Sequence, residues 1–456
     1  MTCLPLVLSV ALGAANTAGT ASTLDLPVEQ YQLKNGLTVM LSEDHELPVA
    51  SLEILYLVGS GYERAGRTGF AHLFEHLMFQ GSQNFDQEYF KPYNAIGANV
   101  NGTTDQDRTN FFETVPSNYL KTPLFMEADR MQFLLPALTQ QKLDNQRDVV
   151  RNERRQSFEN VPYGMVFHYL LEALYPEGHP YRHTPIGSHE DLEAANLEDV
   201  KQFFRQYYVP ANAALTLVGD FQSADAKQQI EHYFGSIPAG IRSPAPAPPL
   251  PVQRALHVTK TDDVPLPRIY LAWHSPALYA PGDAELDLLS GVLTRGKSSR
   301  LYLPLVYDKK IAKEVNAVQV SQSLSSFFVV DATAAPGQSL EALYAELSRA
   351  LTRALSTQPT GPELERARAE FKKSFYGRID NVQSRAATIS SYFQHTGKGD
   401  YLQQDLARYL DATPQKVQQA AKQFIQLDKA VRLDIVPGKK ETDVKAAPAP
   451  AKGTAQ

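Results

Sequence analysis

A chain of 456 residues with a net charge of −6 at pH 7 and a pI near 6.0 is long enough to bury two or three domain cores. Its Lys and Arg residues are scattered, so charge gives no case for binding nucleic acid or an anionic membrane surface. The apolar fraction of 43% and the charged fraction of 21% are typical of a soluble globular protein.

An apolar run from Leu4 to Ala15 opens the chain, and small and polar residues follow it. The run is too short to span a bilayer, so we interpret residues 1–22 as a signal peptide with cleavage after Ala21. No Lys or Arg precedes the run, which is atypical of such signals. Cys3, the one cysteine of the chain, lies inside this segment, so we expect no disulfide in the mature protein. The predicted location is the periplasm, with secretion to the medium as the alternative.

Alternating apolar residues predict strands at residues 52–57 and 268–273, and a long helix is predicted at residues 363–376. The two kinds of element do not follow a regular β-α-β order. The sequence therefore predicts an α+β fold built from sandwich-like layers rather than a doubly wound parallel sheet.

His72, Glu75 and His76 form an H-x-x-E-H pattern. Residues at i, i+3 and i+4 lie on one face of a helix, so both imidazoles and the carboxylate are expected to point the same way. Two neutral imidazoles suit Zn²⁺, and a carboxylate between them can accept a proton from water. The alternative is a chance motif on an ordinary packed helix.

The flanks of this motif favour a helix. Thr68 is the predicted N-cap and Gly81 the predicted end. An apolar stripe is expected to face the core, and its members are Phe70, Leu73, Leu77 and Met78.

A catalytic zinc site needs a third protein ligand and one open position. The candidate is Glu153, near the end of a charged helix that we expect to begin at Thr139. The apolar edge predicted for this helix consists of Leu143, Val149 and Val150. Spacing alone does not distinguish Glu153 from a solvated glutamate.

Asn101-Gly102 is a common hairpin signal, so this segment is either a turn or part of an extended strand. Three histidines at positions 179, 183 and 189 have irregular spacing and no accompanying acidic or thiol cluster. We predict structural or surface roles for them.

Residues 238–253 are rich in proline and predict an extended linker. It would join a catalytic half, residues 23–237, to a second half, residues 254–438. The remaining residues, 439–456, are rich in Ala, Pro and Lys and are predicted to be disordered.

The two halves are predicted to be related by duplication. A helix opened by Asn196 and the strand after it match a helix opened by Thr413 and its following strand. A similar offset places Asp287, Ser290 and Gly291 opposite the three residues of the H-x-x-E-H motif. The second half would therefore keep the scaffold without the metal site.

The H-x-x-E-H motif followed, after 76 residues, by Glu153 resembles the pitrilysin/insulinase-type metallopeptidases, called inverzincins. Further matching stretches are residues 34–39, 97–105, 179–181, 185–187, 208–212 and 219–220. The likeness covers residues 30–437 and is strongest to the bacterial single-unit branch, which also resembles mitochondrial processing peptidase subunits.

This resemblance implies two α/β sandwich halves and one Zn²⁺ per chain. It assigns His72, His76 and Glu153 as zinc ligands and Glu75 as general base. It also implies that a substrate strand docks beside Asn101, Gly102 and Thr103.

Two departures from the family pattern involve three positions. Gln146 stands where members usually carry a second glutamate, and an amide adds no negative charge to the site. Val306 and Lys313 stand at the places of an arginine and a tyrosine that hold substrate and stabilise the oxyanion. We therefore expect a homologous partner subunit that supplies this Arg/Tyr pair, with a homodimer as the alternative.

The predicted function is that of an exported zinc endopeptidase acting on short or unfolded peptides. Two alternatives remain open at this stage: a processing peptidase that cuts at defined sites, and a non-catalytic scaffold subunit of the same fold. The scattered charges predict no binding to nucleic acid. No stable membrane insertion is expected, because no later run of about 18 apolar residues follows the signal.

Overall fold

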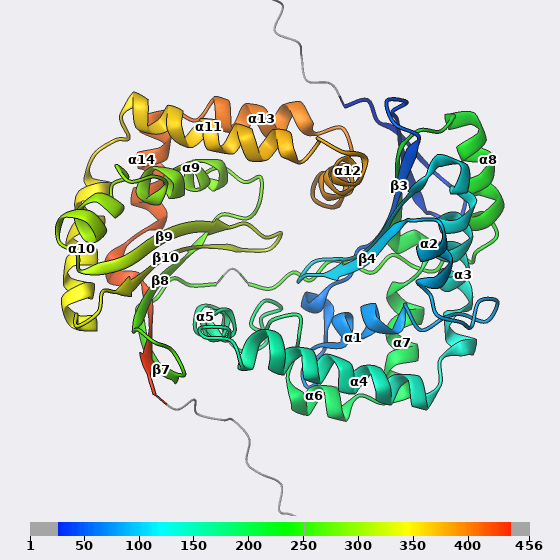
Figure 1. Cartoon of the computed structure of the whole chain (residues 1–456), viewed down its shortest axis with the longest axis horizontal. Helices are drawn as coiled ribbons and strands as arrows, with labels where there is room; N and C mark the ends of the chain where they lie inside the picture. The colour runs from blue at the N-terminus through cyan, green and yellow to red at the C-terminus, as the bar shows by residue number, and fades with distance from the viewer. Residues whose placement is uncertain (1–25, 250, 439–456) are drawn as a thin grey trace, which may run out of the picture.

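The computed structural model describes residues 26–249 and 251–438. The predicted signal peptide (1–22) and the predicted disordered tail (439–456) lie outside the described residues. Two α/β halves stand side by side, each with its own sheet (Figure 1), which confirms the predicted fold class. Within the described residues, no helix is both long and apolar enough to cross a membrane.

The first half is built on a six-stranded sheet of order β1-β2-β6-β3-β5-β4. Its strands are β1 (Glu29–Gln32), β2 (Thr38–Glu43), β3 (Val49–Tyr56), β4 (Asn99–Thr104), β5 (Thr109–Pro116) and β6 (Ala213–Gly219). Its helices are α1 (Phe70–Leu77), α2 (Lys91–Ala95), α3 (Lys121–Ala137), α4 (Gln140–Arg154), α5 (Val166–Leu174), α6 (His189–Ala194), α7 (Leu197–Tyr207) and α8 (Ser223–Phe234). Strand β4 forms one edge of this sheet.

The second half is built on a five-stranded sheet of order β7-β11-β8-β10-β9. Its strands are β7 (Leu256–Asp262), β8 (Arg268–Ser275), β9 (Ala312–Val320), β10 (Ser326–Ala334) and β11 (Val431–Pro437). Its helices are α9 (Asp283–Thr294), α10 (Leu340–Ser356), α11 (Gly361–Gly377), α12 (Val382–Thr396), α13 (Leu402–Leu410) and α14 (Pro414–Phe424).

The two sheets share one topology, as the predicted duplication requires. Leaving out β1, both sheets have the same five-strand pattern: one parallel pair (β2 with β6, β7 with β11) is followed by three antiparallel pairs. Helix α1 follows β3 in the first half as α9 follows β8 in the second. The predicted counterparts of the metal motif, Asp287, Ser290 and Gly291, all lie on α9.

The halves exchange one helix each. Helix α12 of the second half packs Ile389 and Phe393 against Met40 and Leu55 of the first sheet. Helix α5 of the first half packs Leu170, Leu171 and Leu174 on the second sheet, where it meets Tyr270, Phe327 and Leu433. Both sheets are therefore buried on both faces, and each large apolar side chain contributes about 1.5–3 kcal/mol by its burial.

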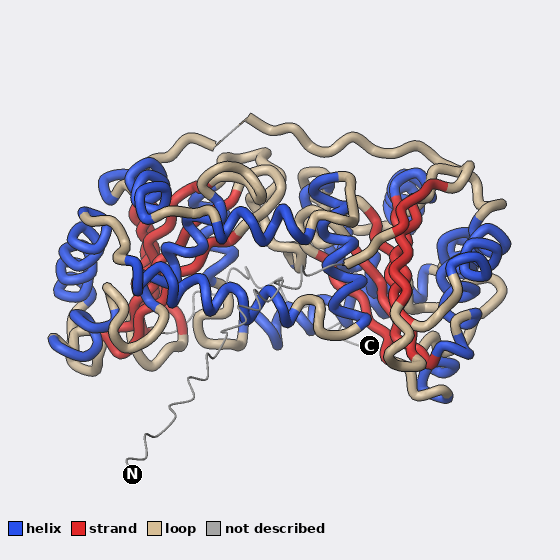
Figure 2. Tube along the Cα trace, turned by 90° about the horizontal axis from the view of Figure 1, so that it is seen from above, coloured by secondary structure: helices blue, strands red, loops and turns tan. Residues whose placement is uncertain are grey.

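Residues 238–255, apart from the undescribed Leu250, form no helix or strand between α8 and β7. Figure 2 shows this stretch running along one side of the molecule from one half to the other. The course agrees with an extended connection between the halves.

Candidate metal centre

Helix α1 carries the H-x-x-E-H motif, and its predicted apolar stripe is buried in the first core. The predicted N-cap is wrong. Gly69, with a φ of +90°, takes that place, because the carboxylate of Asp191 accepts hydrogen bonds from both the N–H and the hydroxyl of Thr68. The helix also ends at Leu77, four residues before Gly81.

A buried carboxylate closes the start of α1 instead. Glu63 accepts hydrogen bonds from the backbone N–H groups of Gly69 (2.9 Å) and Ala71 (2.7 Å). These are N–H groups that the first turn of a helix leaves without partners. Sequence reasoning missed Glu63, because it lies outside the helix that it caps.

Helix α4 positions Glu153. Thr139 is its N-cap and accepts a hydrogen bond from Lys142, as predicted. Leu143 and Val150 are buried, but Val149 is 41% exposed, so its place in the predicted apolar edge is wrong. The helical period turns position 149 about 100° away from position 150 and toward solvent.

The end of α4 is fixed next to the metal-binding residue. Arg154 is buried and donates hydrogen bonds to the backbone carbonyl of Gly187 and to the carboxylate of Glu159 (2.8 Å). Helices α1 and α4 pack against each other, so this anchored end of α4 holds Glu153 beside the imidazoles of α1.

The structure brings together His72, His76 and Glu153. Nε2 of His76 lies 3.3 Å from Oε2 of Glu153, and Nε2 of His72 lies 3.8 Å from Oε1. One ligand atom from each residue lies within 4.8 Å of the other two, and this is the one such group of three among the described residues.

Of these distances, 3.3 Å matches the spacing of two zinc ligands and 3.8 Å slightly exceeds it. Tetrahedral bonds of about 2.0–2.2 Å hold ligand atoms about 3.3–3.6 Å apart. The donor set of two imidazole nitrogens and one carboxylate is one that catalytic zinc sites use. The nitrogen of His72 that faces Glu153 is Nε2, and its other ring nitrogen, Nδ1, is buried without a hydrogen-bond partner among the described residues.

The protonation states also suit a cation. Burial, and then the neighbouring His76, lower the pKa of His72 to about 4. The hydrogen bond with His76 lowers the pKa of Glu153. At neutral pH a neutral imidazole and an ionised carboxylate therefore already face each other, which is the form in which both groups bind metal.

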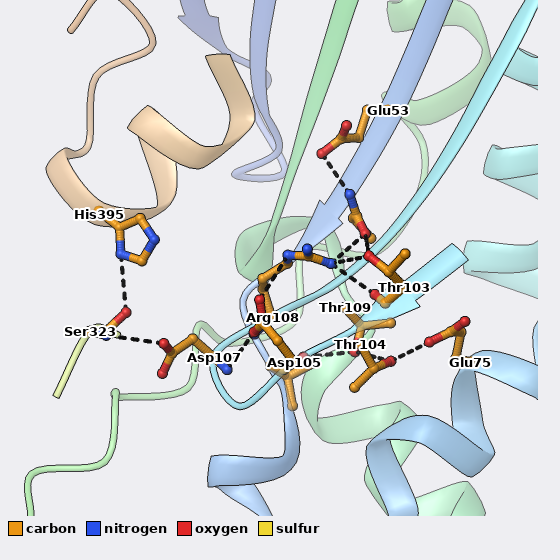
Figure 3. A network of polar contacts seen from close by, with 12 residues as sticks. Glu53, Glu75, Thr103, Thr104, Asp105, Asp107, Arg108, Thr109, Ser323 and His395 are labelled. Carbon is orange, nitrogen blue, oxygen red and sulfur yellow. Dashed lines mark hydrogen bonds and ion pairs between the residues drawn. The ribbon is translucent and has the colours of Figure 1, made fainter. Parts of the chain in front are cut away.

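Glu75 lies between the imidazoles in sequence and is 9% exposed. Its Oε2 accepts a hydrogen bond of 2.6 Å from the hydroxyl of Thr104 (Figure 3). Burial raises the pKa of Glu75, and the hydrogen bond from Thr104 opposes that rise. Thr104 was not among the predicted site residues, although it follows Gly102 by two positions and shares its face of the strand.

The predicted substrate segment is part of strand β4, so the alternative of a turn at Asn101-Gly102 is excluded. As the edge strand, β4 has one side without a neighbouring strand. On this strand Oδ1 of Asn101 accepts a hydrogen bond from the N–H of Gly102 (2.8 Å), and the hydroxyl of Thr103 donates to Asn110 (2.5 Å).

A cavity of about 360 Å³ adjoins His72 and Glu153. Most of its lining is apolar and comes from both halves: Phe158, Phe167, Leu171, Ile186, Val320 and Phe327. Such a space favours an apolar side chain close to the cluster.

Gln146 is buried on α4, two turns before Glu153. Val306 packs at the second core, whereas Lys313 is exposed on β9. The three predicted structural histidines stay outside the cluster: His183 lies 3.6 Å from Glu63, His189 pairs with Glu159, and His179 stacks on Tyr175.

Comparison with known proteins adds to this geometry. Residues 38–184 match the profile of the insulinase family, peptidase family M16, and residues 194–371 match the profile named Peptidase M16 inactive domain. The zinc protease PqqE of Helicobacter pylori is 31% identical over 410 residues, which cover 88% of this chain and 91% of that protein. The chain belongs to the insulinase (M16) family.

Two further comparisons illustrate the range of the likeness. The mitochondrial-processing peptidase subunit beta of Saccharomyces cerevisiae is 24% identical and covers 84% of this chain and 86% of its own. The crystal structure of a protease from Helicobacter pylori superposes with a TM-score of 0.83 at 28% identity, covering 90% of this chain and all of that one. Both halves thus follow the M16 fold.

Proposed function

We propose that this M16 protein is a zinc-dependent endopeptidase that hydrolyses short or unfolded peptides. One observation carries the proposal: the two imidazoles of α1 and the carboxylate of Glu153 on α4 converge at zinc-ligand spacing. The similarity to proteins named zinc proteases supports it. His72, His76 and Glu153 are the proposed ligands.

Glu75 is the proposed general base. When bound, the zinc ion supplies Lewis-acid chemistry that acidifies a water molecule and polarises a peptide carbonyl. Glu75 takes a proton from water on its free oxygen, Oε1, and delivers it to the leaving amine. Burial raises the pKa of Glu75. A carboxyl with a raised pKa suits both roles, because it can accept a proton as a base and then donate it as an acid.

The substrate is proposed to bind as an extended strand beside β4, at Asn101, Gly102 and Thr103. Main-chain hydrogen bonds to a strand edge give affinity with little side-chain selection. Selection then falls to the apolar cavity next to His72, which favours a large apolar residue near the scissile bond.

A homologous partner subunit is proposed to supply the oxyanion donors. The chain offers Val306 and Lys313 at the expected places, and a valine side chain cannot donate a hydrogen bond. The similarity to a protein named subunit beta of a processing peptidase supports an assembly of this kind. A periplasmic location is proposed from the apolar run at residues 4–15, and fractionation of cells expressing the full chain tests it.

Metal content and a single substitution test the function. We expect one zinc ion per chain. The chain together with its partner should cleave peptides, and a chelator should stop this cleavage. Glu75→Gln should keep the zinc and lose at least about 10²-fold in kcat, whereas Glu370→Gln, an exposed glutamate on α11, should keep full activity. A chain without stoichiometric zinc would favour the scaffold alternative, and full activity of Glu75→Gln would remove the proposed base.

A further inference from the structure

Thr104 lies at the end of β4 with its hydroxyl directed at the proposed base. We propose that Thr104 is a positioning residue, which fixes one oxygen of Glu75 so that the other is free to accept the proton. This role rests on the proposed peptidase function and deepens it.

The hydrogen bond has a defined direction. The hydroxyl of Thr109 donates to the carbonyl of Val58 (2.9 Å), so its proton is already used. The hydroxyl of Thr104, 3.4 Å from that of Thr109, keeps its own proton for Oε2 of Glu75. Among the described residues, no other side chain forms a hydrogen bond with this carboxylate. Without Thr104, no side-chain hydrogen bond from the described residues would fix the orientation of the Glu75 carboxylate.

Close packing places β4 against Glu75. A β-carbon at Gly102 would lie 3.2 Å from Cγ of Glu75 and 3.0 Å from the ring of Phe111. The strand therefore approaches the base as closely as a glycine permits. The next residue on the same face of β4 is Thr104, whose side chain reaches the carboxylate itself.

The hairpin that carries Thr104 is fixed at its tip (Figure 3). Oδ1 of Asp105 accepts hydrogen bonds from the backbone N–H groups of Asp107 and Arg108 and so shapes the turn. The carboxylate of Asp107 accepts hydrogen bonds from the hydroxyl of Tyr181 and from the backbone N–H of Ser323 in the second half (3.2 Å).

The second half is thus in contact with the loop that follows Thr104. Ser323 also lies 3.1 Å from Nδ1 of His395 at the end of α12. With its tip held on the second half, the end of β4 has little freedom to move the threonine away from Glu75. A displacement of about 1 Å at a reacting group can cost about 10²-fold in rate.

A purely structural role for Thr104 is the competing explanation, because a β-branched residue suits a strand. Valine and serine variants separate the two roles. Thr104→Val keeps the shape and loses the hydroxyl, and Thr104→Ser keeps the hydroxyl and loses a methyl. Thr114→Val is the matched control, because Thr114 lies on β5 of the same hairpin and its hydroxyl donates to Ser51 on β3, away from the cluster.

The test measures kcat, KM, zinc content and thermal midpoint for the complete chain in the assembly that cleaves peptide. We expect Thr104→Val to lose at least about tenfold in kcat with KM, zinc content and midpoint unchanged. Thr104→Ser should recover to within about threefold of the original chain, and Thr114→Val should match it.

The proposal is overturned if Thr104→Val keeps kcat within about twofold, if Thr104→Ser is as impaired as Thr104→Val, or if Thr104→Val loses zinc or folding stability together with activity. Glu75→Gln distinguishes the two levels. An inactive Glu75→Gln with a fully active Thr104→Val rejects the role of Thr104 alone. An active Glu75→Gln, or an original chain without zinc and peptidase activity, rejects the proposed function and this role with it.

Discussion

Gly102 and Glu75 face each other so closely that a β-carbon at Gly102 would lie 3.2 Å from Cγ of Glu75. Gly102→Ala should therefore displace the proposed base and lower kcat by about 10- to 100-fold, with zinc content unchanged. Gly377→Ala, at a position with nothing within 4 Å of the added carbon, is the control. Equal activity of both variants would contradict the expected crowding.

Zinc removal should destabilise the protein, because an ion that binds only the folded chain adds to the free energy of unfolding. At a hundredfold excess over Kd this amounts to about 2.7 kcal/mol, or a fall of several degrees in Tm on adding a chelator. In His76→Ala the chelator should change Tm little, since one ligand is gone. An equal shift in both proteins would place the bound metal elsewhere.

A buried charge cluster lies between β5 and α3. Arg130 forms hydrogen bonds with Glu127 and lies 3.5 Å from Glu113, and all three side chains are buried. Burial, and then the neighbouring Glu127, raise the pKa of Glu113, so the folded protein favours the neutral form of the Glu113 carboxyl.

Glu113→Gln should then change stability by about 1 kcal/mol or less, because an amide replaces an uncharged carboxyl. Glu127→Gln should cost about 3–5 kcal/mol, because Arg130 loses its carboxylate partner inside the protein. Urea unfolding of the metal-free proteins measures both. The reverse order of the two losses would show that Glu113 carries the charge.

Asp107, at the contact between the halves, should make the stability of the protein depend on pH. Burial raises the pKa of Asp107 above its usual value of 3.8, so the folded protein favours the protonated acid. The stability from this shift is complete below about pH 4 and is lost as the pH rises through the folded pKa, at about 1.4 kcal/mol per pKa unit. Asp107→Asn should remove this part of the pH dependence of Tm in the metal-free protein. An unchanged profile would assign the dependence to other groups.

The apolar cavity should set substrate preference. Phe167, half-exposed on α5, lines the cavity beside His72 and Glu153. Phe167→Gln should lower kcat/KM about tenfold for peptides with a large apolar residue next to the cut, and less for peptides with alanine there. Phe125→Gln, on the surface of α3, is the control. A uniform loss across all peptides would argue against a side-chain pocket.

Local signals in the sequence predicted elements well. Thr139, Asn196 and Thr413 cap the helices that they were expected to open, since each cap depends on a hydrogen bond to a backbone N–H three residues away. The cap at Thr68 failed because a carboxylate 123 positions downstream takes the hydroxyl. No local pattern reports such a partner.

The metal cluster shows the same limit. Periodicity placed His72, Glu75 and His76 on one helix face, but the choice of Glu153 came from family resemblance, because nothing local distinguishes it from other helical glutamates. The roles of Glu63 and Thr104 depend on contacts that form only in the folded chain. An apolar stripe on α5 or α12 likewise does not tell which sheet it will cover.

Because α5 and α12 are exchanged, the proline-rich stretch separates the halves in sequence, but the two halves do not fold as independently stable units. Severing the backbone there would leave two polypeptides in a single particle, since each holds the helix that shields the other. Either piece synthesised alone would expose an apolar sheet face to solvent and would therefore aggregate.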